Sequence, residues 1–249
     1  MPSRQTTNDL VVVPRTVQSE TVDKLRNAIL SGRFKPGERL AESMLCKVMS
    51  VSRTSIREAL RRLEGEKLVL IIPNRGPSVA EISWSEAEGI YKVRALLEAE
   101  AVRLFSTRAT GAEIRLMQNA LSTFGGAVTK NDAIGRIAAT NAFYDVVFQG
   151  CGNSIIGEIL EGLMARINLL RSQSMSRAGR SKFSVTELRK ILRAIESGNS
   201  KAAKEAAIQH IKSACAAAHE VFDAGRSEKT SDKRSRDMGK GRRAPRLAS

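Results

Sequence analysis

The sequence predicts a mainly α-helical protein, with one small β-hairpin near the N-terminus and an all-α helical bundle behind it. Three observations support this prediction. Helix-favouring Ala, Leu, Arg, Lys and Glu are abundant, whereas aromatic residues make up only 4% of the 249 residues. The β-rich runs are confined to residues 68–82, and apolar residues recur at helical spacing from Trp84 onwards. A hydrophobic content of 42% is enough for a sizeable core.

Residues 19–82 predict three helices followed by a β-hairpin. Apolar residues at helical spacing indicate helices at 19–31, 42–49 and 53–67. Three side chains are able to cap the third helix, namely Ser52, Thr54 and Ser55. Two β-rich runs, 68–72 and 78–82, are joined by the turn-forming sequence Asn74-Arg75-Gly76-Pro77. This order of elements is typical of a winged helix-turn-helix.

Residues 84–224 predict a second, all-α domain. Its helices are expected near 84–107, 111–128, 132–149, 153–173, 183–197 and 200–223. Glycine-containing breaks separate some of them, at 125–126, 150–152 and 177–179. The chain ends are expected to lie outside both domains: residues 1–18 as a mobile arm, and residues 225–249, which have almost no apolar side chains, as a disordered basic tail.

The net charge of +15 is concentrated at the two ends of the chain. Residues 1–80 carry 14 Lys and Arg against 8 Asp and Glu, and residues 225–249 carry 9 against 3. The middle carries 18 against 15, which is ordinary for a globular domain. A surplus of this size attracts polyanions, usually nucleic acid. The tail itself is expected to be a solvated extension, with weak non-specific DNA affinity as a by-product.

Several functional classes are disfavoured. The three cysteines, Cys46, Cys151 and Cys215, are widely spaced and indicate neither a disulfide framework nor a metal site, which fits a reducing cytoplasm. No run approaches the ~18 apolar residues of a membrane span. With two histidines, no nucleophile–base spacing and no glycine-rich phosphate loop, the chain is not expected to be an enzyme. A cytoplasmic, nucleoid-associated location is expected.

The third helix carries an apolar face and a basic face. Ile56, Leu60 and Leu63 repeat at one face, whereas Arg53, Arg57 and Arg61 are spaced four residues apart on another. A helix fits the major groove of DNA, and an arginine near its N-terminus is able to donate two parallel hydrogen bonds to guanine. Arg57 is therefore the expected base-reading residue. The other expected DNA contacts are Ser52, Arg53, Thr54 and Ser55 to phosphates, Arg61 to the backbone, and Arg75 with Gly76 in the minor groove.

The run VSRTSIREALRRLEGEKLVLIIPNRGPSVAEI resembles the N-terminal domain of the GntR family of bacterial transcription regulators. In that family, the positions matching Ser52, Arg53, Thr54, Ser55 and Arg57, with Arg75-Gly76 on the wing, touch operator DNA. There is one departure. Some members carry a DNA-contacting arginine in the second helix, and this chain has Ser43 there.

The helical part resembles the FCD effector domain of the FadR subgroup over about residues 90–215. The similarity rests on YKVRALLEAEAVRL, FYDVVFQGCGN and ELRKILRAIESGNSKAAKEAAIQHI, in this order. The resemblance implies a homodimer that binds a small organic acid and thereby shifts the spacing of its DNA-binding heads. Repression is the habit of the family. The expected function is therefore an effector-responsive regulator on a palindromic operator, with an effector-free regulator and an architectural DNA-binding protein as alternatives.

Many FCD domains bind a divalent metal through one Asp or Asn and three His. Carried over, those positions fall on Thr140, Tyr144, Leu188 and His210, of which only His210 is a metal-ligand type. Asn141, one residue away, restores at most one ligand. No metal cofactor is therefore expected. Thr140 and Tyr144 lie on a stripe with Ile137 and Phe148, and His210 lies on an alanine stripe, so these positions are expected to face the domain interior.

Two arginines lie on apolar stripes, where a charge is costly unless it is paired. Arg94 follows Ala87 and Ile90, and Arg166 follows Ile159 and Leu163. The hypothesis is that Arg94, Tyr144 and His210 bind an organic anion directly. The alternatives are an i,i+4 pair of Arg94 with Glu98, a surface or dimer-interface position for Arg166, and a satisfied core histidine at His210.

Overall fold

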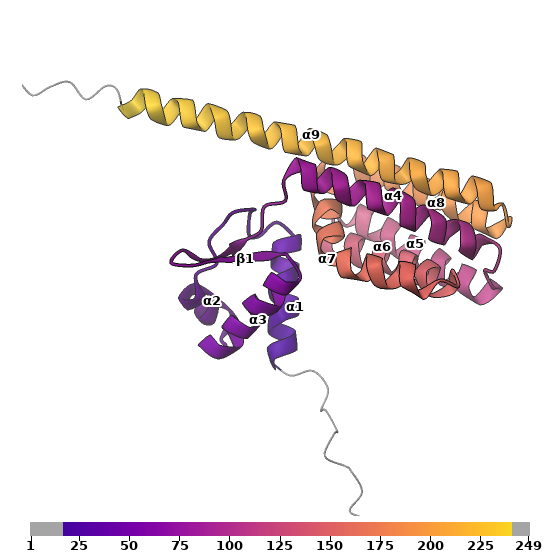
Figure 1. Ribbon diagram of the computed structural model, residues 1–249, viewed down its shortest axis with the longest axis horizontal. Helices are drawn as coiled ribbons and strands as arrows, with labels where there is room; N and C mark the ends of the chain where they lie inside the picture. Colours follow the sequence, from indigo (N-terminus) through magenta and orange to yellow (C-terminus); the bar gives the residue numbers. More distant parts are fainter. Residues whose placement is uncertain (1–16, 241–249) are drawn as a thin grey trace, which may run out of the picture. The chain divides into compact units, whose positions relative to one another are not determined.

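The computed structural model describes residues 17–240, with side chains described as far as Arg226 (Figure 1). The chain divides into two compact units on either side of the Glu81–Ile82 peptide bond. The predicted mobile arm falls outside the described residues, except for its last two residues, which belong to the first helix. No helix within the described range is both long and apolar enough to cross a membrane.

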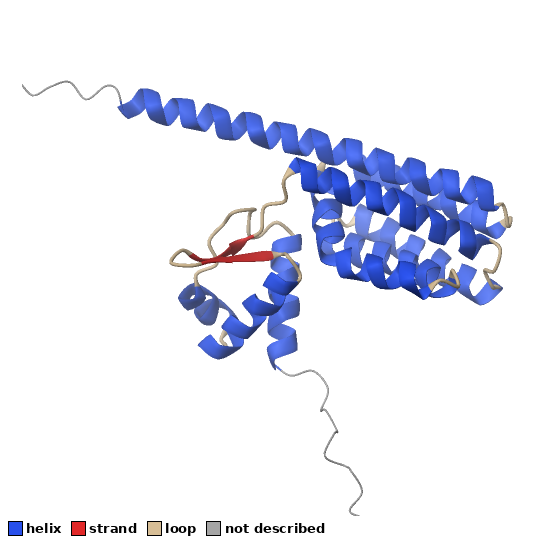
Figure 2. Ribbon diagram, in the orientation of Figure 1, coloured by secondary structure: helices blue, strands red, loops and turns tan. Residues whose placement is uncertain are grey.

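The first unit contains three helices and a hairpin: α1 (Val17–Leu30), α2 (Glu42–Met49), α3 (Arg53–Gly65), β1 (Val69–Ile72) and β2 (Gly76–Val79) (Figure 2). Its core is formed by the apolar faces that the helical spacing predicted. The buried residues are Val22, Leu25 and Ile29 of α1, Leu45 of α2, and Ile56, Leu60 and Leu63 of α3. This core fixes the orientation of α3, so the opposite, basic face of α3 points to solvent.

Strand β2 differs from the prediction. It was expected at 78–82 but spans Gly76–Val79, where it pairs antiparallel with β1 from Val69↔Val79 to Ile72↔Gly76. The turn is therefore tighter than the four residues proposed for it, because Asn74 takes a left-handed conformation with φ of 63°. The extended segment before α2 lies along strand β2, since the amide of Leu40 donates to the carbonyl of Pro77 at 2.8 Å.

The second unit is a bundle of α4 (Trp84–Ser106), α5 (Gly111–Thr129), α6 (Ala133–Gly150), α7 (Ser154–Ser176), α8 (Arg180–Glu196) and α9 (Ser200–Lys240). Helix α4 packs against α6, α7, α8 and α9, so its buried face contributes to the core of the unit. The predicted alanine stripe of α9 is buried at Ala203, Ala207, Ala214 and Ala218. These small side chains allow α9 to approach α4 and α8 closely.

The C-terminal boundary of the bundle is a second difference. Residues 225–249 were expected to be disordered, but α9 continues without a break to Lys240, and residues 241–249 lie outside the described range. Elongating a formed helix costs far less than nucleating one, and this segment is rich in Lys, Arg and Glu, which favour helix. Apolar content alone is therefore a poor guide to where such a helix ends.

Candidate nucleic-acid interface and ligand site

The N-terminus of α3 is capped by Ser52. The side-chain oxygen of Ser52 accepts a hydrogen bond of 3.1 Å from the amide of Ser55, and the two hydroxyl groups lie 2.9 Å apart. This result resolves the three possible caps in favour of Ser52, because its backbone is extended as an N-cap requires. The turn before it is made by Ser50, which is left-handed with φ of 55°. The cap leaves the other first-turn amides available to a phosphate.

The basic face of α3 is exposed as predicted. Arg53, Arg57 and Arg61 all point to solvent, and the side chain of Arg57 is 62% exposed. Arg57 nevertheless has a partner, because its Nε donates to Oε2 of Glu42 at 2.9 Å. Glu42 is the first residue of α2, so this ion pair joins the two helices of the helix-turn-helix. The sequence analysis did not anticipate that the expected base-reading residue is paired in the free protein.

We expect Glu42→Gln to raise affinity for bulk DNA more than Glu58→Gln does. Both changes remove one negative charge near α3, but only Glu42 holds the Arg57 guanidinium. Exposed ion pairs are worth about 0.2–1 kcal/mol, so releasing Arg57 corresponds to a gain of at most about fivefold. Fluorescence anisotropy titrations with random-sequence DNA measure the difference. Equal affinities for the two variants would show that Glu42 does not restrain Arg57.

The tip of the hairpin presents Arg75 to solvent. Gly76 follows it with φ of 79°, a conformation that residues with a Cβ rarely adopt. Arg39 lies nearby, since its Nη2 would be 3.9 Å from a Cβ built on Gly76. The predicted DNA contacts thus occupy the N-terminal part of α3 and the tip of the wing, and Arg39 is a further cation beside the wing that the sequence analysis missed.

The interior of the second unit contains a set of charged and hydroxyl side chains, which we call the buried charge cluster. Its members come from α4, α6, α7, α8 and α9: Tyr91, Arg94, Glu98, Tyr144, Arg171, Arg180, Glu187 and His210. All are buried except Glu187, whose side chain is 18% exposed. Burial of so many ionisable groups is costly unless each finds a partner. Any member without a partner therefore marks a position where a further hydrogen-bonding group would be stabilising.

Arg94 is paired with Glu98, which confirms the i,i+4 alternative for this arginine. Nε of Arg94 donates to Oε1 of Glu98 at 2.7 Å, and Nη2 donates to Oε2 at 3.4 Å. Burial alone would raise the pKa of Glu98, but the positive charges of Arg94 and Arg171 outweigh burial and lower it. Nη1 of Arg94 has no hydrogen-bond partner among the described residues. The Nε and Nη2 edge of the Arg94 guanidinium is therefore fully hydrogen-bonded, whereas Nη1 remains able to donate to another group.

His210 and Arg180 share the carboxylate of Glu187. Nδ1 of His210 lies 2.7 Å from Oε2 of Glu187, and Nη2 of Arg180 forms an ion pair with the same oxygen at 2.8 Å. An ionised carboxylate only accepts, so Nδ1 of His210 carries a proton. Burial lowers the pKa of His210, although the contact with Glu187 opposes that effect. His210 is thus a buried histidine whose Nδ1 has a hydrogen-bond partner, and that partner, Glu187, is a member of the buried charge cluster.

Stability is expected to fall as the pH is lowered from 7 to 4. The folded-state pKa values of both Glu98 and His210 are depressed, so the unfolded chain binds more protons than the native one. The stabilisation from His210 is complete above its unfolded pKa of about 6.5 and that from Glu98 above about 4.5, and each is lost as the pH falls through the lower folded value. Urea titrations across this range measure the slope, and a flat profile would contradict the burial of these charges.

Of the three arginines in the cluster, Arg171 is the one that has no carboxylate partner among the described residues. It is 3% exposed, and its Nη1 donates to the side-chain oxygens of Asn141 at 2.6 Å and Asn168 at 3.2 Å. Its Nε and Nη2 have no partner among the described residues. Burial and repulsion from Arg94 lower the pKa of Arg171 to about 10. The guanidinium also lies 5.3 Å from the centre of the Tyr144 ring, whose hydroxyl is itself buried and unpaired.

The sequence analysis selected Arg166 on this helix instead of Arg171. Arg166 lies at the surface of α7, where its Nη1 donates to Oε1 of Glu86 at 3.2 Å. The buried stripe assigned to it was wrong, because Ile159 is 46% exposed. The stripe that does face the interior is Leu160, Ile167, Arg171 and Ser174. The structure therefore does not bring Arg166 into the cluster.

The four positions carried over from the family's metal site do not fit a divalent metal. The hydroxyl of Thr140 donates to the carbonyl of Arg136 at 2.8 Å, and Leu188 is a buried apolar side chain. Tyr144 stacks on Phe148 and sits in the cluster, and His210 uses Nδ1 for Glu187. Within residues 17–226, no group of three or more His, Cys, Asp or Glu is arranged to hold a metal ion. Zinc and similar ions require three or four such donors.

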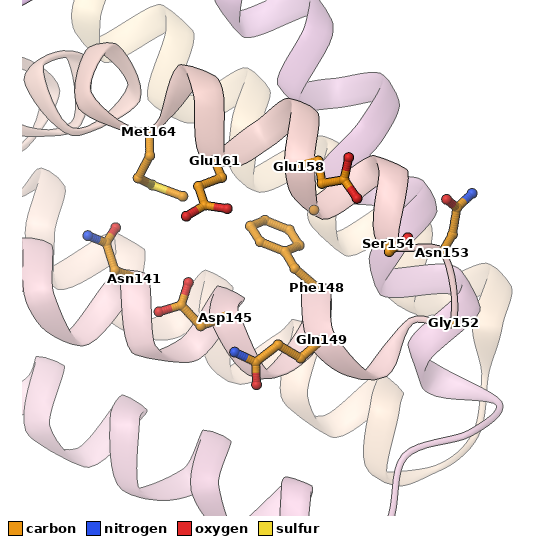
Figure 3. Close-up of a pocket in the computed structure, with 11 residues that line it drawn as sticks. Asn141, Asp145, Phe148, Gln149, Gly152, Asn153, Ser154, Glu158, Glu161 and Met164 are labelled. Atoms are coloured by element: carbon orange, nitrogen blue, oxygen red, sulfur yellow. The ribbon is translucent and has the colours of Figure 1, made fainter. Parts of the chain in front are cut away.

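A separate cleft of about 750 Å³ lies between α6 and α7 (Figure 3). Asp145, Glu158 and Glu161 give it an acidic lining, the wrong charge for an organic acid. Asn141 and Met164 line the cleft on one side and contact Arg171 on the other. Asn141 therefore forms part of the wall between the cleft and the buried charge cluster, and the two are different sites.

Comparison with known families agrees with this division of the chain. The description "Bacterial regulatory proteins, gntR family" matches residues 17–79, and the FCD domain matches residues 89–213. The regulator YdhC of Bacillus subtilis, described as HTH-type, is 28% identical over 205 residues, which cover 82% of this chain and 92% of that protein. The HTH-type transcriptional repressor GlaR of Escherichia coli is 29% identical over 143 residues, covering 56% and 65%.

Solved structures show the same fold. McbR/YncC of E. coli superposes with a TM-score of 0.71 at 20% identity, over 84% of this chain and 99% of that one. A GntR transcriptional regulator from Rhodococcus superposes with a TM-score of 0.69 at 25% identity, over 83% and 98%. The winged helix-turn-helix, the helical second unit and both family matches lead to one assignment: this chain belongs to the GntR family of bacterial transcription regulators and carries an FCD domain.

Proposed function

We propose that this regulator is a repressor of the FadR subgroup, which binds a palindromic operator as a homodimer and changes its DNA affinity when a small organic acid occupies the FCD domain. The observation that carries the DNA-binding part is the exposed first turn of α3, capped by Ser52 and followed by Arg53 and Arg57. Similarity to GlaR, itself described as a repressor, supports the direction of regulation.

The positions of the side chains support a role for each proposed DNA contact. Arg57 lies one turn into α3, where a guanidinium reaches guanine in the major groove once it leaves Glu42. Arg53, Thr54 and the amides of the first turn face phosphates, and Arg61 contacts the backbone further along. Arg75 and Gly76 enter the minor groove from the wing, and two-fold symmetry of a dimer favours a palindromic site.

The buried charge cluster supports the effector part of the proposal. Arg94, Tyr144 and Arg171 hold hydrogen-bond donors that no described residue accepts, in the interior of the bundle. Unpaired buried donors are costly, so a ligand that accepts them stabilises the arrangement of helices to which it binds. The acceptor is a small organic anion, bound directly by side chains without a metal.

Mapping the protein on its own genome by footprinting tests the proposal, followed by competition of the recovered site against bulk DNA. A shared palindrome and a specificity ratio of about 10³ or more are expected for a regulator. A ratio near one would favour an architectural DNA-binding protein, for which the +15 charge is the supporting observation. DNA binding that no carboxylate alters would favour a regulator without an effector.

Chelation is expected to change neither stability nor DNA binding. The carried-over metal positions offer a hydroxyl that is already hydrogen-bonded to the backbone, a phenol, a leucine and one histidine, and this donor set does not fit a divalent metal that a chelator removes. Thermal unfolding and operator titrations before and after dialysis against EDTA provide the measurement. Re-addition of Zn²⁺ or Ni²⁺ serves as the control, and a midpoint that falls with EDTA and recovers with metal would contradict the prediction.

A further inference from the structure

We infer that the buried charge cluster selects an organic acid with a single negative charge, and that Arg171 is the residue that anchors its carboxylate. This inference rests on the proposed effector role and specifies the ligand and the anchor. Two observations support it: the net charge of the cluster, and the lack of a hydrogen-bond partner for Nε and Nη2 of Arg171.

The charge balance comes from the pairing already described. Arg94 is matched by Glu98, and Arg180 is matched by Glu187. His210 shares the carboxylate of Glu187 through Nδ1, and a neutral imidazole with its proton on Nδ1 satisfies that contact. Arg171 remains, so three guanidinium groups face two carboxylates and the cluster carries one uncompensated positive charge. A buried site with one excess positive charge is neutralised by one negative charge, not by two.

The geometry of Arg171 fits a carboxylate. Its Nη1 is held by Asn141 and Asn168, which are neutral acceptors that orient the guanidinium without cancelling its charge. Its Nε and Nη2, both buried and unpaired, form the edge of the fork that binds a carboxylate through two parallel hydrogen bonds. Asp145, which lines the acidic cleft outside the cluster, interacts electrostatically with Arg171 while burial raises its pKa, but it forms no hydrogen bond or ion pair with the Arg171 guanidinium among the described residues.

Two further donors belong to the same site. The Tyr144 ring lies against Arg171 and the Tyr144 hydroxyl is buried without a partner, as is Nη1 of Arg94. Burial raises the pKa of Tyr144, so the phenol stays protonated and able to donate. Tyr144 is also close enough to Arg94, Arg171, Glu98 and Glu187 to interact electrostatically with each of them. A second carboxylate on the ligand would therefore be repelled by Glu98 and Glu187.

The experiment uses the full chain and straight-chain monocarboxylates from acetate to hexanoate, each with the dicarboxylate and the primary amide of the same length. Calorimetry and the thermal unfolding midpoint report binding to the wild type, Arg171→Met, Arg171→Lys and Arg166→Met. Arg166→Met is the matched control, since it makes the same change on the same helix outside the cluster. Arg171→Met removes an unpaired buried charge, so the unliganded variant is expected to be at least as stable as the wild type.

The expected result is that a monocarboxylate binds the wild type and Arg166→Met alike and binds Arg171→Met about 100-fold more weakly, the loss of two charge-assisted hydrogen bonds. Arg171→Lys keeps the charge without the fork and is expected to lose about tenfold. The matched dicarboxylate and amide bind at least about tenfold more weakly than the monocarboxylate. Equal binding to Arg171→Met, tighter binding of dicarboxylates, or no binding by any monocarboxylate overturns the inference.

Operator titrations with the same probes separate this inference from the proposed function. A monocarboxylate that binds through Arg171 but leaves DNA affinity unchanged supports the ligand site and rejects the effector role. A probe that changes DNA affinity equally in the wild type and Arg171→Met supports an effector role and rejects Arg171 as its anchor.

Discussion

Replacing Glu98 by glutamine is expected to lower the free energy of unfolding by about 3–5 kcal/mol, the range found when one partner of a buried ion pair is removed. Glu98 is fully buried, and its carboxylate is the hydrogen-bonded partner of Arg94. It also lies in the field of Arg171, so its loss leaves two buried guanidinium groups with no carboxylate on α4 to balance them.

Urea denaturation followed by fluorescence measures this loss in the second unit. The single tryptophan, Trp84, packs 4.3 Å from His219 and 5.4 Å from Phe222 between ring centres, so its emission reports on the contact between α4 and α9. Glu100→Gln is the control, because Glu100 lies on the same helix but pairs with Arg103 and Lys204 at the surface. That change is expected to cost no more than about 1 kcal/mol.

A double variant, Arg94→Met with Glu98→Leu, distinguishes charge from packing. Removing both partners leaves no buried charge from this pair, and such replacements are often neutral or stabilising. The double variant is therefore expected to recover most of the stability that Glu98→Gln loses. If Glu98→Gln were as stable as Glu100→Gln, the pair would contribute nothing beyond a surface contact.

Arg57→Ala is expected to weaken operator binding by about 1–3 kcal/mol, roughly 5- to 150-fold, while affinity for bulk DNA changes much less. Arg57 is exposed one turn into α3, and in the proposed binding mode it donates two parallel hydrogen bonds to guanine, so its loss is expected to remove base readout. Arg53→Ala, at the first position of α3, is expected to weaken both kinds of binding and to reduce the salt dependence by about one phosphate contact.

Fluorescence anisotropy with operator and random-sequence DNA at several salt concentrations checks both expectations. Arg62→Ala is the matched control, because Arg62 is exposed in the last turn of α3, away from the helix N-terminus that enters the groove. Its loss is expected to change the operator-to-bulk ratio less than twofold. The assignment of Arg57 fails if Arg57→Ala weakens operator and bulk DNA by the same factor.

The helix-turn-helix and most of the bundle were predictable because their signals are local. Ser52 caps α3, Ser83 caps α4 and Thr110 caps α5, and each begins a run with a single apolar face. The same periodicity placed Thr140, Tyr144 and His210 in the interior. Where one face is polar and one apolar, the sequence alone determines which side chains point inward.

Arg171 and Arg180 were missed for physical reasons that the structure makes plain. Helix α7 is apolar on more than one face, since Ile155 and Ile159 are exposed while Ile156 and Leu160 are buried, so its phase cannot be read from hydrophobicity. Arg180 was expected in a loop because α8 was predicted from 183, but α8 begins at Arg180 after Gly179, which has φ of 78°. Long-range pairs such as Arg180 with Glu187 and His210 depend on tertiary packing.

The chain between the two units is very short. The amide of Ala80 still donates to Leu68 in the hairpin, and the side chain of Ser83 already caps α4. Only Glu81 and Ile82 lie between these two anchors. Helix α4, which begins directly after this connection, also carries Arg94 and Glu98 of the buried charge cluster. The proposed effector role therefore has a covalent route of two residues between the helix that carries the cluster and the wing.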